Sequence, residues 1–249
     1  MSDIYAAPAA NLDLPRDDDP EAGSLERGIA GDYTFTIGEV LKEAWARSEG
    51  AKLTLNLAML AYVVIYLAAA GIAEFALTPL IEEQPLIIAI AFIIFQQLFL
   101  LAIALPLAVG IFILGVRRAA SAPIAVAQIF NHYHKLLSLL GANILMTIAI
   151  FIGFALLVIP GIYLAIALMF TLALVVEKSL SPLAALSASR KAVHVRWFPI
   201  AGFCLVLMLI NAVAAIPLGI GLIWTVPFSV IACGVLYRRI FGCEPETLA

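Results

Sequence analysis

Residues 86–116 have the sequence LIIAIAFIIFQQLFLLAIALPLAVGIFILGV, a run without a single Asp, Glu, Lys or Arg. A helix needs about 20 consecutive apolar residues to cross the hydrocarbon core of a bilayer, so this run is more than long enough. Pro106 lies inside it, but a membrane helix tolerates a proline where neighbouring groups satisfy the freed backbone. The stretch therefore predicts one long, tilted or kinked transmembrane helix rather than two short ones.

Most of the remaining chain has the same apolar character. Apolar residues make up 64% of the sequence and charged residues only 12%, whereas about a quarter of the residues in a soluble domain are charged. The predicted spans are 53–77, 86–116, 136–159, 161–177, 198–217 and 218–237. We therefore expect an all-α, polytopic membrane helical bundle of about six transmembrane helices.

Proline and glycine mark two of the predicted reversals. The third and fourth spans are separated only by Ile159-Pro160-Gly161, and the fifth and sixth by residues 217–221, which include Gly219 and Gly221. Such residues favour tight turns. Both pairs of spans should therefore form helical hairpins.

The basic residues predict how the spans are oriented. Lys and Arg concentrate in loops that remain in the cytoplasm. All 14 of them lie before the first span or after the second, fourth and sixth spans. The three opposite turns contain none, and the first of these turns carries Glu82 and Glu83. Both termini are therefore predicted to be cytoplasmic.

The two ends of the chain differ from the apolar part. Residues 1–32 are rich in Ala, Pro, Asp, Glu and Gly and have no apolar periodicity, which predicts a disordered acidic tail. The predicted membrane domain covers 33–242, and 243–249 form a short C-terminal tail. No basic stripe with interleaved aromatic residues occurs, so nucleic-acid binding is not expected.

The basic connections are amphipathic, which predicts helices in the cytoplasmic interface. In 35–49, Thr36 and Glu39 fit a capping box at the start of such a helix. Its apolar positions are Ile37, Val40, Leu41, Ala44 and Trp45, and its polar positions are Glu39, Lys42, Glu43 and Arg47. The second connection has a similar stripe of Val126, Ile129, Phe130, Tyr133 and Leu137.

The third connection begins with Ser181-Pro182, which fits an N-cap followed by proline at the first helical position. Its weaker apolar stripe comprises Leu183, Leu186, Val193 and Trp197. The chain can thus be described as three units, each an interfacial helix followed by a hairpin. An ordinary protein with an even number of spans and basic loops would give the same pattern, so both interpretations stay open.

The second half of the chain carries a family resemblance. The stretches concerned are LVIPGIYL at 157–164, SPLAALSAS at 181–189, Gly219-Ile220-Gly221 with Pro227, and YRRIFG at 237–242. They resemble a broad group of bacterial polytopic proteins that includes the membrane domain attached to some glycerophosphoryl diester phosphodiesterases. The resemblance implies a bacterial cytoplasmic (inner) membrane protein. It implies no catalytic residues, because the phosphodiesterase chemistry belongs to a separate soluble domain.

Few residues suggest chemistry. His132 and His134 are two residues apart and would point to different sides of a helix, whereas helical metal ligands are four apart. Cys204, Cys233 and Cys243 are scattered, so we expect neither a metal site nor a cofactor. Glu74 is the one acidic residue well inside a predicted span, where an ionisable group is a functional candidate. It lies near the outer end of that span, which favours simple solvation.

We therefore expect a non-enzymatic membrane protein that supports envelope or membrane homeostasis through lipids or a membrane-protein partner. The predicted contact residues are Lys42, Trp45, Arg47, Lys135, Arg190, Lys191, Arg196 and Trp197. Basic and aromatic side chains of this kind suit the headgroup region. The alternative is a small transporter or lipid-handling permease, in which prolines would break helices beside a substrate path. An intramembrane enzyme ranks last because no catalytic arrangement is evident.

Overall fold

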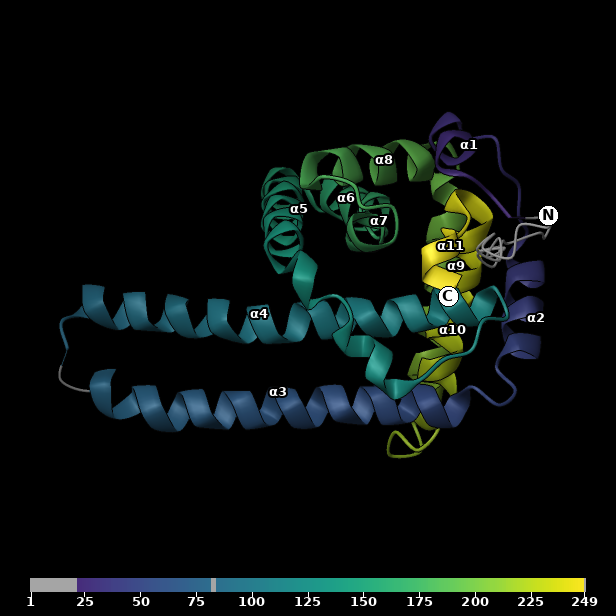
Figure 1. Cartoon of the computed structure of the whole chain (residues 1–249). Coiled ribbons are helices and arrows are strands. Elements are labelled where there is room, and N and C mark those ends of the chain that lie inside the picture. The colour runs from purple at the N-terminus through teal and green to yellow at the C-terminus, as the bar shows by residue number, and fades with distance from the viewer. Residues whose placement is uncertain (1–21, 82–83, 249) are drawn as a thin grey trace, which may run out of the picture.

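A computed structural model describes residues 22–81 and 84–248, and within these ranges the chain forms helices and no strands (Figure 1). Six helical segments are long and apolar enough to cross a membrane. They are Lys52–Pro79, Leu86–Ala119, Val126–Leu156, Val158–Glu177, Trp197–Ala215 and Leu222–Phe241. The all-α, six-span prediction is therefore confirmed as a fold class.

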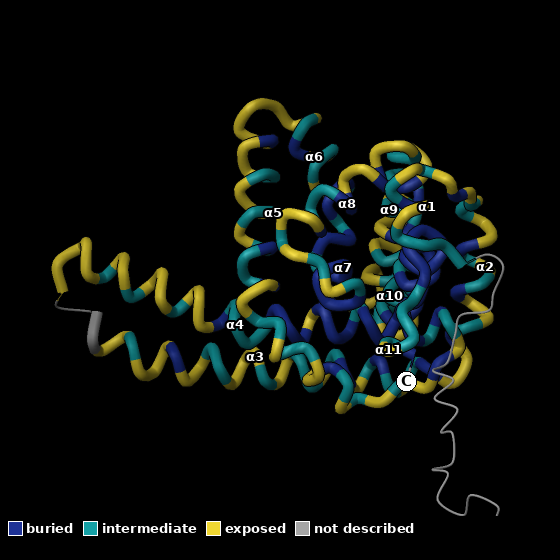
Figure 2. The backbone as a smooth tube through the Cα atoms, turned by 45° about the horizontal axis from the view of Figure 1, so that its top comes forward, coloured by how far each residue is buried: buried dark blue, intermediate teal, exposed yellow. Residues whose placement is uncertain are grey.

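Helices α3 (Lys52–Ile81) and α4 (Leu86–Ala119) form a long hairpin. Pro106 lies inside α4 without interrupting it, as the sequence predicts. The far half of the hairpin extends beyond the other helices, and Figure 2 shows that its surface is largely exposed. In both views α5 runs across the direction of α4, so the hairpins leave the centre in different directions.

Helices α5 (Leu136–Leu156) and α6 (Val158–Ala167) form the second hairpin, and its turn lies slightly earlier than predicted. The break falls at Leu157, whose backbone is extended, and Pro160 and Gly161 already belong to α6. Proline is tolerated there because the first N–H groups of a helix have no intrahelical partner. Gly161 must lack a side chain, since a Cβ would overlap the ring of Phe154.

The fourth predicted span is not one continuous helix. It divides into α6 and α7 (Thr171–Glu177), with a break at residues 168–170. No proline occurs at this break. The predicted span over 161–177 is present as the candidate span Val158–Glu177, but its helix is irregular at residues 168–170.

The third hairpin comprises α9 (Trp197–Ala215) and α10 (Leu222–Phe241). Its turn is where the sequence predicts it, and Leu218 and Gly219 both adopt positive φ there. Helices α10 and α4 form the centre of the molecule. They are in backbone contact at Gly115 and Gly234, where a Cβ on Gly234 would overlap the carbonyl group of Gly115.

We expect Gly234→Leu to prevent α4 and α10 from packing. Overpacking a well-packed interior costs about 1–3 kcal/mol or more, and here the obstacle is backbone, which cannot move aside as a flexible side chain can. The yield of monodisperse protein in detergent and its melting temperature measure the effect. Gly71→Leu is the matched control, because no atom lies within 4 Å of a Cβ at that position. Equal melting temperatures for the two variants would contradict this account.

The connections on the basic side pack closely onto the helices. Helix α2 (Ile37–Arg47) begins with the predicted capping box of Thr36 and Glu39, and it buries Val40 and Ala44. The second connection is not an amphipathic α-helix, since it forms two short 3₁₀ turns, Val126–Phe130 and Tyr133–Lys135. These turns are held on α4, where the Tyr133 hydroxyl donates to the Ile103 carbonyl at 2.9 Å.

Helix α8 (Pro182–Val195) has the predicted N-cap Ser181, but its buried face differs from the predicted stripe. Of the predicted stripe, Val193 is buried and Leu186 and Trp197 pack against the core, whereas Leu183 is 69% exposed. Small residues form most of the buried face. The Ser189 hydroxyl donates to the Ala167 carbonyl at 2.9 Å, next to the break between α6 and α7. Small side chains let α8 lie close against α5, α6 and α7.

Both ends of the described chain are folded. Helix α1 (Leu25–Ala30) packs on α8 and α10, so disorder was wrongly predicted for 22–32, while residues 1–21 lie outside the described part. The Tyr33 hydroxyl donates to the Ala192 carbonyl at 2.8 Å. Burial raises the pKa of Tyr33 to about 12, against the opposing effect of Arg196. At the other end, the short helix α11 (Pro245–Leu248) buries Leu248.

Candidate functional site

An ion network holds α2 on the end of α10. The Glu43 carboxylate lies 3.2 Å from Arg238 Nη1 and 2.8 Å from Arg239 Nη2, and Glu39 lies 3.6 Å from Arg239 Nη1. Arg238 is 2% exposed and Arg239 8%. Glu43 was predicted on the polar face of an interfacial helix. That polar face instead contacts two buried guanidinium groups, which explains why α2 lies against α10.

A second buried carboxylate joins α7, α10 and the C-terminal segment. The side chain of Glu177 is fully buried, accepts a hydrogen bond from the Tyr237 hydroxyl at 2.9 Å, and accepts another from the Glu244 backbone N–H. Lys178 Nζ lies 3.4 Å from the Glu177 carboxylate and 2.8 Å from the Glu244 carboxylate. This arrangement provides Glu177 with both a countercharge and hydrogen bonds, as a buried charge requires.

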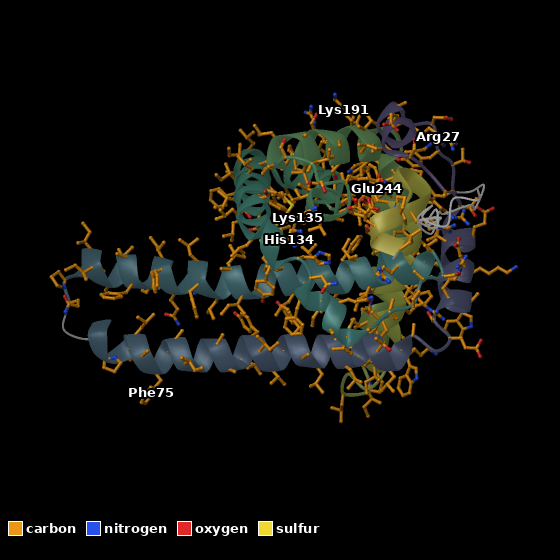
Figure 3. All side chains as sticks on the ribbon, viewed as in Figure 1. Arg27, Phe75, His134, Lys135, Lys191 and Glu244 are labelled. Carbon is orange, nitrogen blue, oxygen red and sulfur yellow. The ribbon has the colours of Figure 1, made fainter. Side chains whose placement is uncertain are left out.

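A cavity of about 210 Å³ lies beside this second network. Its walls come from α4, the 3₁₀ turns of the second connection, the end of α7, and α11. The polar residues lining it are Arg117, Gln128, Asn131, His132, His134, Lys135, Glu177, Ser179, Glu246 and Thr247. Figure 3 shows His134 and Lys135 side by side near the start of α5.

The two cationic side chains that line this cavity, Lys135 and Arg117, are hydrogen-bonded to neutral oxygen atoms. Lys135 Nζ donates to the Val176 carbonyl and to the Ser179 hydroxyl, each at 2.7 Å. The Arg117 guanidinium donates to the carbonyl groups of Pro123 and Thr247. Within the described ranges, neither cation has a carboxylate at ion-pair distance.

A separate cleft of about 240 Å³ lies where α8 meets α6, lined by Tyr163, Arg190, Lys191 and His194. The Tyr163 hydroxyl and His194 Nδ1 are 2.9 Å apart. Arg190 and Lys191 are exposed and have no ion pair with any described carboxylate. In Figure 3 Lys191 projects outward from α8. Basic, aromatic and imidazole groups thus meet at one open surface.

Aromatic side chains border this cleft. Trp197 Nε1 donates to the Tyr163 carbonyl at 3.3 Å, and the two rings lie 6.0 Å apart. Trp197 also packs edge-on against Phe198, which is 82% exposed. The start of α9 therefore presents exposed apolar surface that is joined through Trp197 to Tyr163 of the cleft.

The eight predicted contact residues do not form one surface. Trp45, 68% exposed, lies on α2 with Lys52 Nζ 5.3 Å from its ring, and Lys42 is exposed on the same helix. Arg47 is partly buried and pairs with Glu43 at 3.7 Å. Lys135 lines the cavity beside α4, while the remaining four lie at the α8–α9 junction. These four are Arg190, Lys191, Arg196 and Trp197.

Glu74 lies on the α3–α4 hairpin, away from both the cavity and the cleft. Its carboxylate accepts hydrogen bonds from the Thr78 hydroxyl at 3.2 Å and the Gln96 amide at 3.3 Å. The cavity and the cleft described above are lined by other residues. The geometry therefore gives Glu74 polar partners within the hairpin.

His132 and His134 line the same cavity. His134 Nδ1 lies 2.8 Å from the Asn131 carbonyl oxygen. In the part of the chain that the structure describes, no three His, Cys, Asp or Glu side chains are grouped so that they could hold a metal ion.

Sequence reasoning missed Arg117, Glu177 and Tyr237 as members of polar clusters. Each lies at or near the end of a predicted span, where a charged or phenolic group is ordinarily assigned to the interface. The available signal was the position of Glu177 directly after a long apolar run and directly before Lys178. No protein-family model, curated protein or solved structure matches the chain, so its function must be argued from these residues.

Proposed function

We propose that this protein is a non-enzymatic integral membrane protein that binds anionic lipid headgroups and so supports envelope or membrane homeostasis. The observation that carries the proposal is the cleft of about 240 Å³ lined by Tyr163, Arg190, Lys191 and His194. Its two cations have no described carboxylate partner, so their charges are available to a ligand. A lipid phosphate supplies the matching oxygen acceptors.

The surroundings of the cleft favour a lipid over a free ion. Val195, 53% exposed, directly follows His194 of the cleft, and Phe198, 82% exposed, packs on Trp197, which contacts Tyr163 of the cleft. Tyrosine and tryptophan are enriched at the headgroup level of membranes, where one end of the ring is apolar and the other polar. A lipid would place its phosphate on Arg190 and Lys191 and its acyl chains along the exposed apolar residues.

Replacing Arg190, Lys191 and Arg196 together by Gln should remove most retained anionic lipid. A basic residue near an anionic surface contributes about 1 kcal/mol, so the triple change should weaken binding by roughly 100-fold. Native mass spectrometry of protein extracted in mild detergent, with phosphatidylglycerol as the probe, measures the retained lipid.

The matched control also removes three positive charges, but outside the cleft, by changing Arg27, Lys42 and Lys52 to Gln. All three lie outside the cleft, on α1, α2 and the start of α3. This control should keep nearly all of the lipid. Lipid retention equal to wild type in the α8–α9 triple variant, or equal loss in both triple variants, would reject the cleft as the lipid site.

One observation favours the alternative of a small transporter or permease. The helix break at residues 168–170 leaves α7 as a short, almost wholly buried half-helix, and Thr171 Oγ1 is buried there without a described hydrogen-bond partner. Discontinuous helices form the substrate sites of many transporters. Pro106 and Pro227 do not break their helices, Pro160 lies in the first turn of α6, and Pro217 lies in the turn between α9 and α10, so none of these four prolines breaks a helix. A flux assay on reconstituted protein tests this alternative.

A further inference from the structure

We infer that the cavity between α4, the second connection, α7 and α11 is a binding site for a small anion bearing a phosphate group. This site is separate from the lipid cleft and shares no lining residue with it. Its volume of about 210 Å³ is below the about 300–1,000 Å³ of pockets that enclose drug-sized ligands. The ligand should therefore be a phosphate ion or the headgroup end of a larger molecule.

The cavity wall has two cations and two carboxylates, and the two cations are hydrogen-bonded only to neutral groups. Arg117 and Lys135 reach the cavity with only carbonyl and hydroxyl oxygens as described partners. Lys178 Nζ lies 3.4 Å from the Glu177 carboxylate and 2.8 Å from the Glu244 carboxylate, so it offsets the charge of Glu177 only in part. A cation in a partly buried site is stabilised by an opposite charge more than by neutral dipoles. The wall therefore has two cations whose charge a bound phosphate would balance.

Neutral donors complete the wall. Gln128 uses its carbonyl oxygen to accept the Ala125 backbone N–H at 3.0 Å, which leaves its amide N–H groups without a described acceptor. The side chains of Asn131 and His132 also have no described hydrogen bond, although they line the cavity. Lys135 has three N–H groups, of which two are used. These groups can donate to phosphate oxygens without breaking an existing contact.

Glu246 sets a limit on the strength of the site. It is exposed on α11 at the edge of the cavity and makes no ion pair with Lys135 or Arg117. Its negative charge therefore opposes an incoming anion. Because the side chain makes no hydrogen bond or ion pair with the described residues, and acts on Lys135 only through its charge, replacing it should not disturb the fold.

The test measures binding of inorganic phosphate to the full chain in detergent by isothermal titration calorimetry at constant ionic strength. Glu246→Gln should tighten binding by roughly threefold or more, since one like charge is removed from the edge of the site. Lys135→Gln should weaken it at least tenfold. Glu49→Gln is the control and should change nothing, because Glu49 is exposed, lies two residues beyond the end of α2 and does not line the cavity.

A second set of titrations replaces inorganic phosphate with phosphatidic acid in the same micelles, with phosphatidylcholine as the neutral comparison. If only phosphatidic acid binds, and Glu246→Gln tightens that binding, the phosphate belongs to a lipid headgroup. If inorganic phosphate binds with the same dependence, the ligand is a free anion or a soluble phosphate ester. Binding of neither probe, or binding indifferent to both Glu246 and Lys135, would overturn the inference.

Discussion

A single cysteine at Leu218 should react with a membrane-impermeant maleimide added to intact cells, whereas a cysteine at Lys191 should react only after the membrane is opened. Leu218 is 96% exposed in the turn between α9 and α10, and that turn lacks Lys and Arg. Lys191 belongs to a connection rich in both. Basic residues remain on the cytoplasmic side, so the two positions should lie on opposite sides of the bilayer.

The experiment uses a background in which Cys204, Cys233 and Cys243 are changed to Ala, with Gln84→Cys as a second outer site and His134→Cys as a second inner site. In intact cells, we expect nearly complete labelling at the two outer sites and almost none at the two inner sites. Labelling of His134→Cys in intact cells would disprove the predicted orientation.

Leu157→Cys tests the α5–α6 hairpin most severely. Helix α5 has 21 residues, so its length of about 31 Å suffices to cross the bilayer core. The maleimide added outside the cell should therefore label Leu157→Cys. However, Tyr163 lies only six residues after Leu157, or about 9 Å along the helix, and it contacts His194 of the basic connection. This contact places the turn close to the predicted cytoplasmic side. An unlabelled Leu157→Cys beside a labelled Leu218→Cys would show a hairpin that returns within the bilayer. The predicted side of the termini would not change, because a hairpin ends on the side where it begins.

Local patterns predicted the helices well because they depend on near neighbours. The apolar run of 86–116 became α4, with Pro106 inside it, and the capping box of Thr36 and Glu39 formed as expected. Each of these features needs only residues a few positions apart. The same holds for Ser181-Pro182, which begins α8.

Contacts between distant residues could not be predicted in this way. Amphipathic spacing correctly gave α2 a buried face, but it could not show that Glu43 meets Arg238 and Arg239, almost 200 positions later. It placed Glu43 on the polar face of an interfacial helix, because a charged side chain is usually not buried. The break at residues 168–170 carries no Gly or Pro signal, so tertiary packing decides it. For these reasons the eight predicted contact residues lie at three separate places in the structure: on α2, beside the cavity, and where α8 meets α9.

Lys178→Met should be among the most destabilising single changes in this protein. The variant leaves the Glu177 carboxylate fully buried without its countercharge, and Lys178 itself is only 7% exposed. Removing one partner of a buried ion pair costs about 3–5 kcal/mol. For a chain of this size, about 1 kcal/mol corresponds to roughly 2–4 °C. The melting temperature in detergent should therefore fall on the order of 10 °C, as measured by thermal unfolding of the purified protein.

The charge of Glu177, rather than the lost lysine stem, should cause this effect. Adding Glu177→Gln to Lys178→Met removes the uncompensated charge, while the new amide oxygen can still accept from the Glu244 N–H and the amide NH2 group can donate to the Tyr237 hydroxyl oxygen. The double variant should therefore melt at a higher temperature than Lys178→Met alone, which is the signature of two coupled residues. Lys191→Met makes the same chemical change at an exposed position and should shift stability by no more than about 0.5 kcal/mol. If the double variant melts below Lys178→Met, the packing of the lysine stem, and not the ion pair, holds α7 to the C-terminal segment.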